Sequence, residues 1–187
     1  MNVTQTRIPG LVVVEPRILR DDRGYFLETY STERYRNAGI QEDFVQDNLS
    51  FSERGVLRGL HYQYPHSQGK LVQVVAGEVF DVVVDIRAGS PTFGRWVGER
   101  LSDKNHRQMY IPPGFAHGFC VLSGQALFSY KCTDYYSPDT EGGVIWSDPD
   151  IKIAWPVDMP VVSAKDAAYP RLKDIERDRL PRYEGDK

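Results

Sequence analysis

The chain has 187 residues, of which 41% are hydrophobic and 26% are charged. This length suits one domain, expected over residues 1–187, and the composition argues against disordered, collagen-like, coiled-coil and disulfide-rich proteins. Twenty-three Lys and Arg residues against 26 Asp and Glu residues give a net charge of −3, so we expect no general attraction to nucleic acid or to anionic membranes. Any anionic ligand must be held by a local cluster of positive groups.

The predicted elements are mostly short strands. Sixteen glycines and twelve prolines separate runs rich in Val, Ile, Phe and Tyr, a pattern that predicts an all-β sandwich or barrel. The clearest strand covers residues 79–87, where Phe80, Val82 and Val84 alternate with polar residues that include Asp81 and Asp85. One face of this strand should pack and the other should meet something polar. In chain order, strands are predicted at residues 11–15, 25–30, 56–63, 71–76, 79–87, 95–101, 108–111, 115–122 and 126–135.

Helices should be few and short. Residues 31–38 form one candidate, with Ser31 as the cap at its start and Gly39 as the left-handed stop. Ser163 is in position to cap a second helix over residues 164–168.

The two ends of the chain carry little signal. The apolar run at residues 11–14 is four residues long and ends at Glu15, too short for an export signal or a membrane span. We therefore expect a cytoplasmic protein. The charged tail from about residue 171 to 187 matches no motif, is given no role, and should end at the surface.

The cysteines and histidines do not form a recognisable metal motif. Cys120 and Cys132 lie in predicted strands rather than in a Cys-x-x-Cys pair, and we expect reduced, packed thiols. His61 and His117 raise the hypothesis of a metal site, but Gln63 stands where a His-x-His pair would need a second histidine. A metal site is therefore not favoured.

His61 is the most informative candidate for chemistry. It shares a strand face with Gly59, so a small residue beside the imidazole should leave room for a ligand. His117 lies in a second strand, on the face that carries Phe115 and Phe119. A lone histidine would more simply be a structural residue, but a second one strengthens the interpretation as a pocket.

Other side chains suit acid catalysis or anion binding. Tyr130 shares a strand face with Phe128, and it is either a core aromatic residue or a general acid. Arg23 lies near Phe26, and Arg58 comes three residues before His61. Arginine forks bind phosphate in a bidentate manner, and an aromatic ring can stack on a base. No glycine-rich phosphate loop or Rossmann fingerprint is present.

Several segments occur in an order that is typical of a known family. The segments are residues 22–24, 44–48, 56–63, 69–72, 77–82, 113–119 and 163–167. Together they resemble the dTDP-4-dehydrorhamnose 3,5-epimerase family, over nearly the whole chain, from about residue 8 to residue 170.

The resemblance implies a jelly-roll, cupin-like β-barrel, usually a homodimer, that uses no metal or organic cofactor. It also implies conversion of dTDP-4-dehydro-6-deoxy-α-D-glucose into dTDP-4-dehydro-β-L-rhamnose, a step of dTDP-L-rhamnose biosynthesis. The enzyme would invert C3 and C5 of the sugar.

By resemblance, His61 is the general base, Tyr130 is the proton donor, Asp166 orients His61, and Lys70 lies beside the C4 oxygen. Tyr130 is preferred as the acid to the tyrosines at residues 135–136, which border a turn. The resemblance leaves open whether a neighbouring subunit supplies some of the residues that bind the nucleotide sugar. Those residues are Arg23, Phe26, Glu28, Gln46, Asp47, Asn48, Arg58, His117, Glu141 and Lys165.

Three alternatives remain at this point. The chain is a C3-only or C5-only nucleotide-sugar epimerase, a metal-dependent cupin enzyme such as a dioxygenase, or a nucleotide-sugar-binding module without catalysis. A binding module would need Arg23, Phe26 and Arg58, but it would have no use for His61 and Tyr130.

Overall fold

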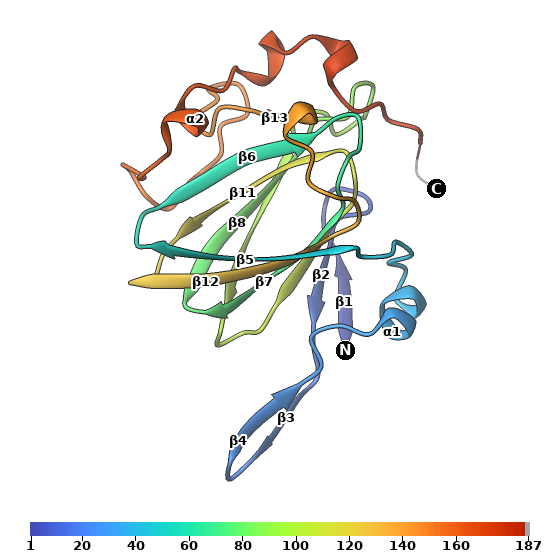
Figure 1. Cartoon of the computed structure of the whole chain (residues 1–187), viewed down its shortest axis with the longest axis vertical. Helices are drawn as coiled ribbons and strands as arrows, with labels where there is room; N and C mark the ends of the chain where they lie inside the picture. The colour runs from blue at the N-terminus through green and yellow to red at the C-terminus, as the bar shows by residue number, and fades with distance from the viewer. Residues whose placement is uncertain (186–187) are drawn as a thin grey trace.

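Two antiparallel sheets face each other in the computed structural model, which describes residues 1–185 (Figure 1). The six-stranded sheet has the order β1 (Asn2–Gln5), β2 (Val12–Glu15), β10 (Gln108–Ile111), β7 (Lys70–Ala76), β12 (Gln125–Cys132) and β5 (Gln46–Glu53). The five-stranded sheet has the order β13 (Glu141–Gly143), β6 (Leu57–Gln63), β11 (Phe115–Val121), β8 (Glu78–Asp85) and β9 (Trp96–Ser102). The predicted all-β sandwich is confirmed.

The main core fills the space between the sheets. Phe119 of β11 stacks on Phe128 of β12 with ring centroids 4.2 Å apart, which joins the two sheets directly. Aliphatic side chains from both sheets surround this pair, among them Val72, Val83 and Leu101. The side chains of β12 that face this space are Phe128, Tyr130 and Cys132, because residues two apart share a strand face.

Strand β8 is buried on both faces, which the alternation of its residues did not predict. Val82 and Val84 point to a second core on the outer side of the sheet, as expected. On the other face, Asp81 and Asp85 are fully buried between the sheets rather than exposed to water. A carboxylate in such a place needs a charged or hydrogen-bonding partner.

The C-terminal segment covers the outer face of the five-stranded sheet (Figure 1). It contains α2 (Ala164–Ala167), η2 (Leu172–Asp174) and η3 (Arg177–Arg179). Leu172 and Leu180 are buried in the outer core, so the tail packs further along its length than its charge suggested. The last two residues, 186–187, at which the tail was expected to reach the surface, lie outside the described residues.

Both predicted helices are present. Helix α1 (Thr32–Asn37) is followed by Gly39 at φ +96°, the expected left-handed stop. Ser31 occupies the N-cap position, but its side chain makes no capping hydrogen bond. Ser163 does cap α2, because its Oγ accepts a hydrogen bond from the backbone N–H of Asp166 at 3.0 Å.

Strand β5 was not predicted, because its alternation is inverted. Asn48 and Ser50 face the space between the sheets, whereas Leu49 and Phe51 are 66% and 53% exposed on the outside. Strands β1 and β13 and the 3₁₀ turn η1 (Pro138–Thr140) were also not predicted. The polar residues of β5 thus line the interior of the sandwich, where a ligand pocket would need them.

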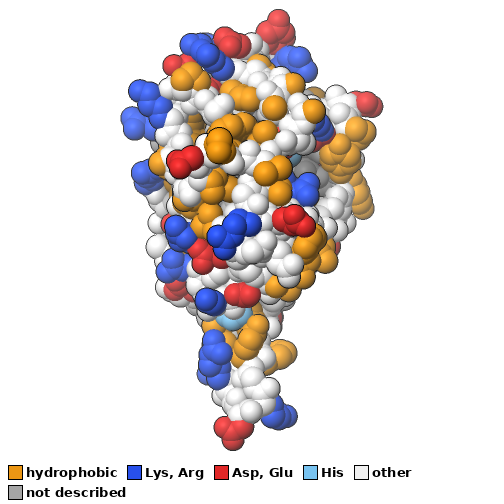
Figure 2. Space-filling model, turned by 90° about the vertical axis from the view of Figure 1, so that its left-hand side faces the viewer, with side chains coloured by type: hydrophobic (Ala, Val, Ile, Leu, Met, Phe, Trp, Pro, Cys, Tyr) orange, Lys and Arg blue, Asp and Glu red, His pale blue; other side chains and the backbone are white. Residues whose placement is uncertain are grey.

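A hairpin of β3 (Ile18–Asp21) and β4 (Gly24–Leu27) projects away from the two sheets. It forms the lower end of the molecule in Figure 1 and the narrow extension in Figure 2. Strand β3 was not predicted, since most of its residues are exposed. None of the helices in the described part of the chain has the length and apolar character needed to cross a membrane.

Candidate active site

Helix α2 brings Asp166 to His61 on β6. The Nε2 atom of His61 lies 2.8 Å from Oδ1 of Asp166, and the backbone N–H of Gly59 donates to Oδ2 at 3.2 Å. The side chain of Asp166 is 6% exposed, and that of His61 is 31% exposed. His61 is therefore held from behind by a buried carboxylate while part of its ring remains open.

The contact with Asp166 determines which ring nitrogen of neutral His61 carries the proton. Burial alone would raise the pKa of Asp166, but the hydrogen bonds from His61 and Gly59 hold it below its ordinary value. An ionised carboxylate only accepts hydrogen bonds, so neutral His61 carries its proton on Nε2 and a free lone pair on Nδ1. The pair is built to present Nδ1 as a base.

Gly59 serves the packing of the two strands rather than the space for a ligand. A Cβ atom at this position would lie 2.5 Å from Cα of Gly118 and 2.9 Å from the carbonyl oxygen of His117, and Gly59 has φ +130°. The expectation that Gly59 leaves room beside the imidazole is therefore wrong. The glycine allows β6 and β11 to approach closely where their register shifts.

His117 lies directly opposite His61 in the pairing of β11 with β6. Its Nε2 is 2.8 Å from Oδ2 of Asp81, and its side chain is 8% exposed. The other oxygen of Asp81, Oδ1, is buried without a hydrogen-bond partner among the described residues. Asp81 thus holds one ring nitrogen of His117, the residue that pairs with His61 across the two strands.

Tyr130 projects from β12, in the sheet that faces β6. The centroid of its ring lies 6.0 Å from that of Phe128, and the partly buried side chain packs against the main core. Burial raises the pKa of Tyr130 above its ordinary value, so the phenol keeps its proton at neutral pH. Tyr135 and Tyr136 are 66% and 53% exposed, in keeping with the preference for Tyr130.

Lys70, at the start of β7, lies beside Tyr130. Its Nζ is 5.9 Å from the centroid of the Tyr130 ring, and it makes no hydrogen bond or ion pair with any residue that the structure describes. Burial lowers the pKa of Lys70, whereas nearby Cys132, Asp81 and Glu141 favour its charged form. An unpaired ammonium in such a position is available to a ligand.

Glu141 on β13 is a partly buried carboxylate near the groups described above. Burial alone would raise its pKa, but Lys165, which forms an ion pair with it, and Tyr136, whose hydroxyl donates to it at 2.9 Å, keep the pKa low. In the pairing of β13 with β6, Glu141 lies opposite Gln63, two residues from His61. The charge of Glu141 favours the charged form of Lys70 and contributes to the raised pKa of Tyr130.

Polar side chains extend the site along β5 and β6. Gln46 donates to Asn48 at 3.0 Å, and Asn48 donates to Sγ of Cys132 at 3.6 Å. Nε of Arg58 donates to Oγ of Ser52 at 2.9 Å. The positive charge of Arg58 acts to lower the pKa of Tyr130, against the larger effect of burial. Arg58 therefore adds a cation to the candidate site.

Four of the predicted site residues lie away from His61 in the folded chain. Asp47 points to the outer face of β5, where it pairs with Lys131 at 2.9 Å. Arg23 and Phe26 are on the projecting hairpin, and Phe26 is 69% exposed. Glu28 follows the hairpin and pairs with Arg34 at 3.2 Å. Within one chain, the structure does not bring these residues to His61.

The sequence analysis did not assign roles to three residues of the site. Asp81 interrupts an apolar run, which was a usable signal for a buried partner of a histidine. Tyr136 was judged by its place at a turn, although its hydroxyl reaches Glu141. Tyr169 packs edge-on against His61 with centroids 5.8 Å apart, and nothing in its local sequence indicates this contact.

The two cysteines are free and buried, as expected. Among the described residues, no group of three or more His, Cys, Asp or Glu side chains is placed to hold a metal ion. His61 and His117 each use a ring nitrogen to contact a carboxylate instead.

Comparisons with known proteins agree with this arrangement. The sequence model of the family described as dTDP-4-dehydrorhamnose 3,5-epimerase matches residues 5–174. A dTDP-4-dehydrorhamnose 3,5-epimerase from Pseudomonas aeruginosa is 56% identical over 178 residues, which cover 94% of this chain and 98% of the relative.

Solved structures give the same result. A dTDP-6-deoxy-D-glucose-3,5-epimerase from Legionella pneumophila, in complex with dTDP-4-keto-L-rhamnose, is 54% identical with a TM-score of 0.96, covering 98% of this chain and 99% of that one. A 3'-monoepimerase from Streptomyces bikiniensis, in complex with dTDP-quinovose, is 38% identical with a TM-score of 0.90, covering 96% and 92% of the two chains. The cupin-like fold expected from the resemblance is confirmed, and the chain belongs to the dTDP-4-dehydrorhamnose 3,5-epimerase family.

Proposed function

We propose that this protein converts dTDP-4-dehydro-6-deoxy-α-D-glucose into dTDP-4-dehydro-β-L-rhamnose by inverting C3 and C5, as a step of dTDP-L-rhamnose biosynthesis. The observation that carries the proposal is the arrangement of two proton-transfer groups on facing sheets. His61, backed by Asp166, comes from β6, and Tyr130 comes from β12. A base and an acid that approach a sugar ring from opposite sides are what inversion of a carbon requires.

His61 removes a proton next to the C4 ketone, and this step needs help. A proton on such a carbon is about a dozen pK units less acidic than a histidine, a gap of about 16 kcal/mol at 1.36 kcal/mol per unit. The enolate oxygen must therefore be stabilised as its charge develops. The unpaired ammonium of Lys70 supplies a positive charge beside Tyr130 in a site where burial strengthens electrostatic interactions.

Tyr130 returns a proton to the opposite face of the same carbon and becomes a phenolate. Before the second carbon reacts, His61 gives up its proton and Tyr130 takes one up again, by exchange with water. Because burial raises its pKa, the phenol is in the protonated form that this role needs. C3 and C5 keep their oxidation states during inversion, so these side chains supply the proton transfers without a redox cofactor. We infer that no metal or organic cofactor takes part.

The nucleotide and sugar are held by the remaining polar groups around His61. Gln46 and Asn48 face the interior of the sandwich, and the guanidinium of Arg58 offers donors suited to a phosphate. His117, Glu141 and Lys165 complete the set within one chain.

Analysis of the product tests the proposal. Incubated with dTDP-4-dehydro-6-deoxy-α-D-glucose, the protein should give a product inverted at both carbons, seen in proton NMR coupling constants. His61→Ala should abolish inversion, whereas His66→Ala, which changes a solvent-exposed histidine, should not. Unchanged substrate with the natural protein, or full activity of His61→Ala, would refute the proposal.

A C3-only epimerase is the second candidate. The structural relative from Streptomyces bikiniensis is a 3'-monoepimerase at 38% identity, so the fold is found with this narrower reaction as well. The same spectra separate the two candidates, because a C3-only enzyme leaves the coupling constants of C5 unchanged.

We further propose that the protein is a homodimer in which the β3–β4 hairpin reaches the partner. The outer face of the six-stranded sheet leaves Leu49, Phe51 and Val75 more than half exposed, and Figure 2 shows hydrophobic side chains on the body and on the projecting hairpin. Pairing would cover these side chains. It would also bring Arg23 and Phe26 to the site of the partner.

Sedimentation tests the dimer. The natural chain should sediment at twice the monomer mass, and Phe51→Asp should shift it toward the monomer. A monomeric natural chain would contradict the proposal. We also propose that residues 1–187 act as one domain in the cytoplasm and bind neither nucleic acid nor membranes, which limited proteolysis, cell fractionation and binding assays test.

A further inference from the structure

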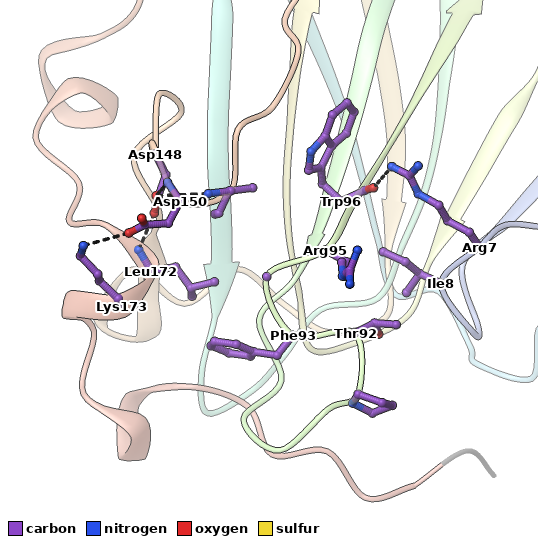
Figure 3. A pocket seen from close by; sticks show the side chains of 13 residues that line it. Arg7, Ile8, Thr92, Phe93, Arg95, Trp96, Asp148, Asp150, Leu172 and Lys173 are labelled. Carbon is purple, nitrogen blue, oxygen red and sulfur yellow. Dashed lines mark hydrogen bonds and ion pairs between the residues drawn. The ribbon is translucent and has the colours of Figure 1, made fainter.

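A cavity of about 710 Å³ lies beside the outer core of the five-stranded sheet (Figure 3). Its walls come from the segment after β1, the loop between β8 and β9, residues 148–151 and η2. Leu172 and Ile151 in its wall belong to the outer core, whereas His61 and Tyr130 face the space between the sheets. The cavity is therefore separate from the proposed catalytic groups.

Two guanidinium groups line this cavity without a carboxylate partner among residues 1–185. Arg7 donates from Nη2 to the backbone oxygen of Trp96, and its Cζ lies 5.5 Å from the Trp96 ring. The side chain of Arg95 makes no hydrogen bond or ion pair with any residue in the described part of the chain, and in Figure 3 it lies between Arg7 and Phe93. These groups keep several N–H donors free for a ligand.

The acidic side chains of the cavity are already engaged. Asp148 is buried, and its oxygens accept from the backbone N–H groups of Asp150 at 2.9 Å, of Ile151 at 3.4 Å and of Leu172 at 2.8 Å. Asp150 pairs with Lys173 at 2.9 Å. The positive charges that remain unneutralised are those of the two arginines.

The other walls are apolar and partly aromatic. Ile8, Phe93, Trp96, Ile151 and Leu172 contribute surfaces beside the arginines. Cavities of about 300–1,000 Å³ with apolar walls and a few polar groups are typical of sites for small molecules. Guanidinium groups suit a phosphate or carboxylate, and aromatic walls suit a planar ring.

We propose that this cavity is a second binding site, for an anion that carries an aromatic ring, of the class of a nucleoside diphosphate. The choice of dTDP as the probe rests on the proposed function, since the substrate carries that group. Arg95 and Arg7 bind the phosphates, and the ring lies against the apolar wall.

Calorimetric titration of the full chain with dTDP tests the proposal. The natural protein should bind two molecules per chain. Arg95→Ala should weaken one of these by at least tenfold and leave the other unchanged, and Arg58→Ala should do the reverse. Arg177→Ala, which removes an exposed arginine that does not line the cavity, should affect neither. Inorganic phosphate should bind the Arg95 site at least tenfold more weakly than dTDP, because it has no ring.

The outcomes separate this inference from the proposed function. A single class of dTDP site that Arg95→Ala leaves unchanged would overturn the inference, as would equal weakening by Arg177→Ala or phosphate binding as tight as that of dTDP. A single class that depends on Arg95 but not on Arg58 would support the inference while contradicting the proposed nucleotide site. Retained binding at the Arg58 site shows that Arg95→Ala is folded.

Discussion

Asp166→Asn is the substitution that tests the proposed base most sharply. The carboxylate accepts two hydrogen bonds, from Nε2 of His61 at 2.8 Å and from the backbone N–H of Gly59 at 3.2 Å. The two bonds go to different oxygens, and an amide of the same size has an oxygen at only one of these positions, so in this geometry it accepts one bond and not both. If its oxygen stays on Gly59, its NH₂ faces His61 and forces the imidazole proton onto Nδ1. The lone pair that the base needs is then lost.

The size of the effect follows from this geometry. A hydrogen bond to a charged group contributes about 1.5–3 kcal/mol, which is roughly 10- to 150-fold in rate at 1.36 kcal/mol per tenfold. The wrong tautomer costs more, as in serine proteases, where exchanging the orienting aspartate for asparagine lowers kcat about 10⁴-fold. We therefore expect kcat to fall by about 10²- to 10⁴-fold.

Steady-state kinetics with product detection by NMR measures this loss. The affinity for dTDP should stay within about threefold of the natural value, since Asp166 is not expected to touch the nucleotide. Asp158→Asn is the matched control, because it makes the same change at an exposed position of the same segment. A folded Asp166→Asn protein with kcat within threefold of the natural enzyme would refute the role of the pair.

Three further substitutions follow from the site. Tyr130→Phe removes the proton donor and should lower kcat by about 10²- to 10⁴-fold, measured by the same assay; a loss below threefold would remove Tyr130 as the acid. Burial lowers the pKa of Lys70, so activity should fall as pH rises through a value below lysine's ordinary 10.5, and a pH profile without this alkaline limb would contradict its role. Burial disfavours charged Lys70 relative to the unfolded chain, so the stability of the fold rises with pH between the lowered pKa and 10.5. Lys70→Met should abolish activity yet raise Tm at neutral pH, because the variant no longer buries a charge; a decrease in Tm would contradict this. Gly59→Ala combines a positive φ with a clash against Gly118 and should cost about 2–5 kcal/mol, lowering Tm by at least about 4 °C; an unchanged Tm would show that the strands can part.

The fold was predictable where the alternation of residues reflects burial. Most of the strands from β6 to β12 carry apolar residues at alternate positions, and all seven were predicted from the sequence. β5 escaped detection because its polar side chains face inward and Leu49 and Phe51 face outward. Prediction of strands from alternating apolar residues assumes that the interior is apolar. It fails for a strand whose inward side chains line a polar pocket.

The sequence predicted most of the residues of the site, but it did not predict all of the contacts between them. The resemblance supplied Asp166 as the partner of His61, more than a hundred positions away, and the structure places the two in contact. Asp81 was noted only as a polar residue on a strand, because its pairing with His117 depends on the register of β8 and β11. Long-range register of this kind is not encoded in the spacing of residues along one strand.

In the proposed reaction, one base and one acid act on both carbons beside the C4 ketone. Incubation of the substrate with the natural protein in deuterium oxide, followed by NMR of the sugar, measures this directly. We predict deuterium at both C3 and C5, with no exchange at either carbon in His61→Ala. Deuterium at only one carbon of the product, or exchange that persists in His61→Ala, would contradict it.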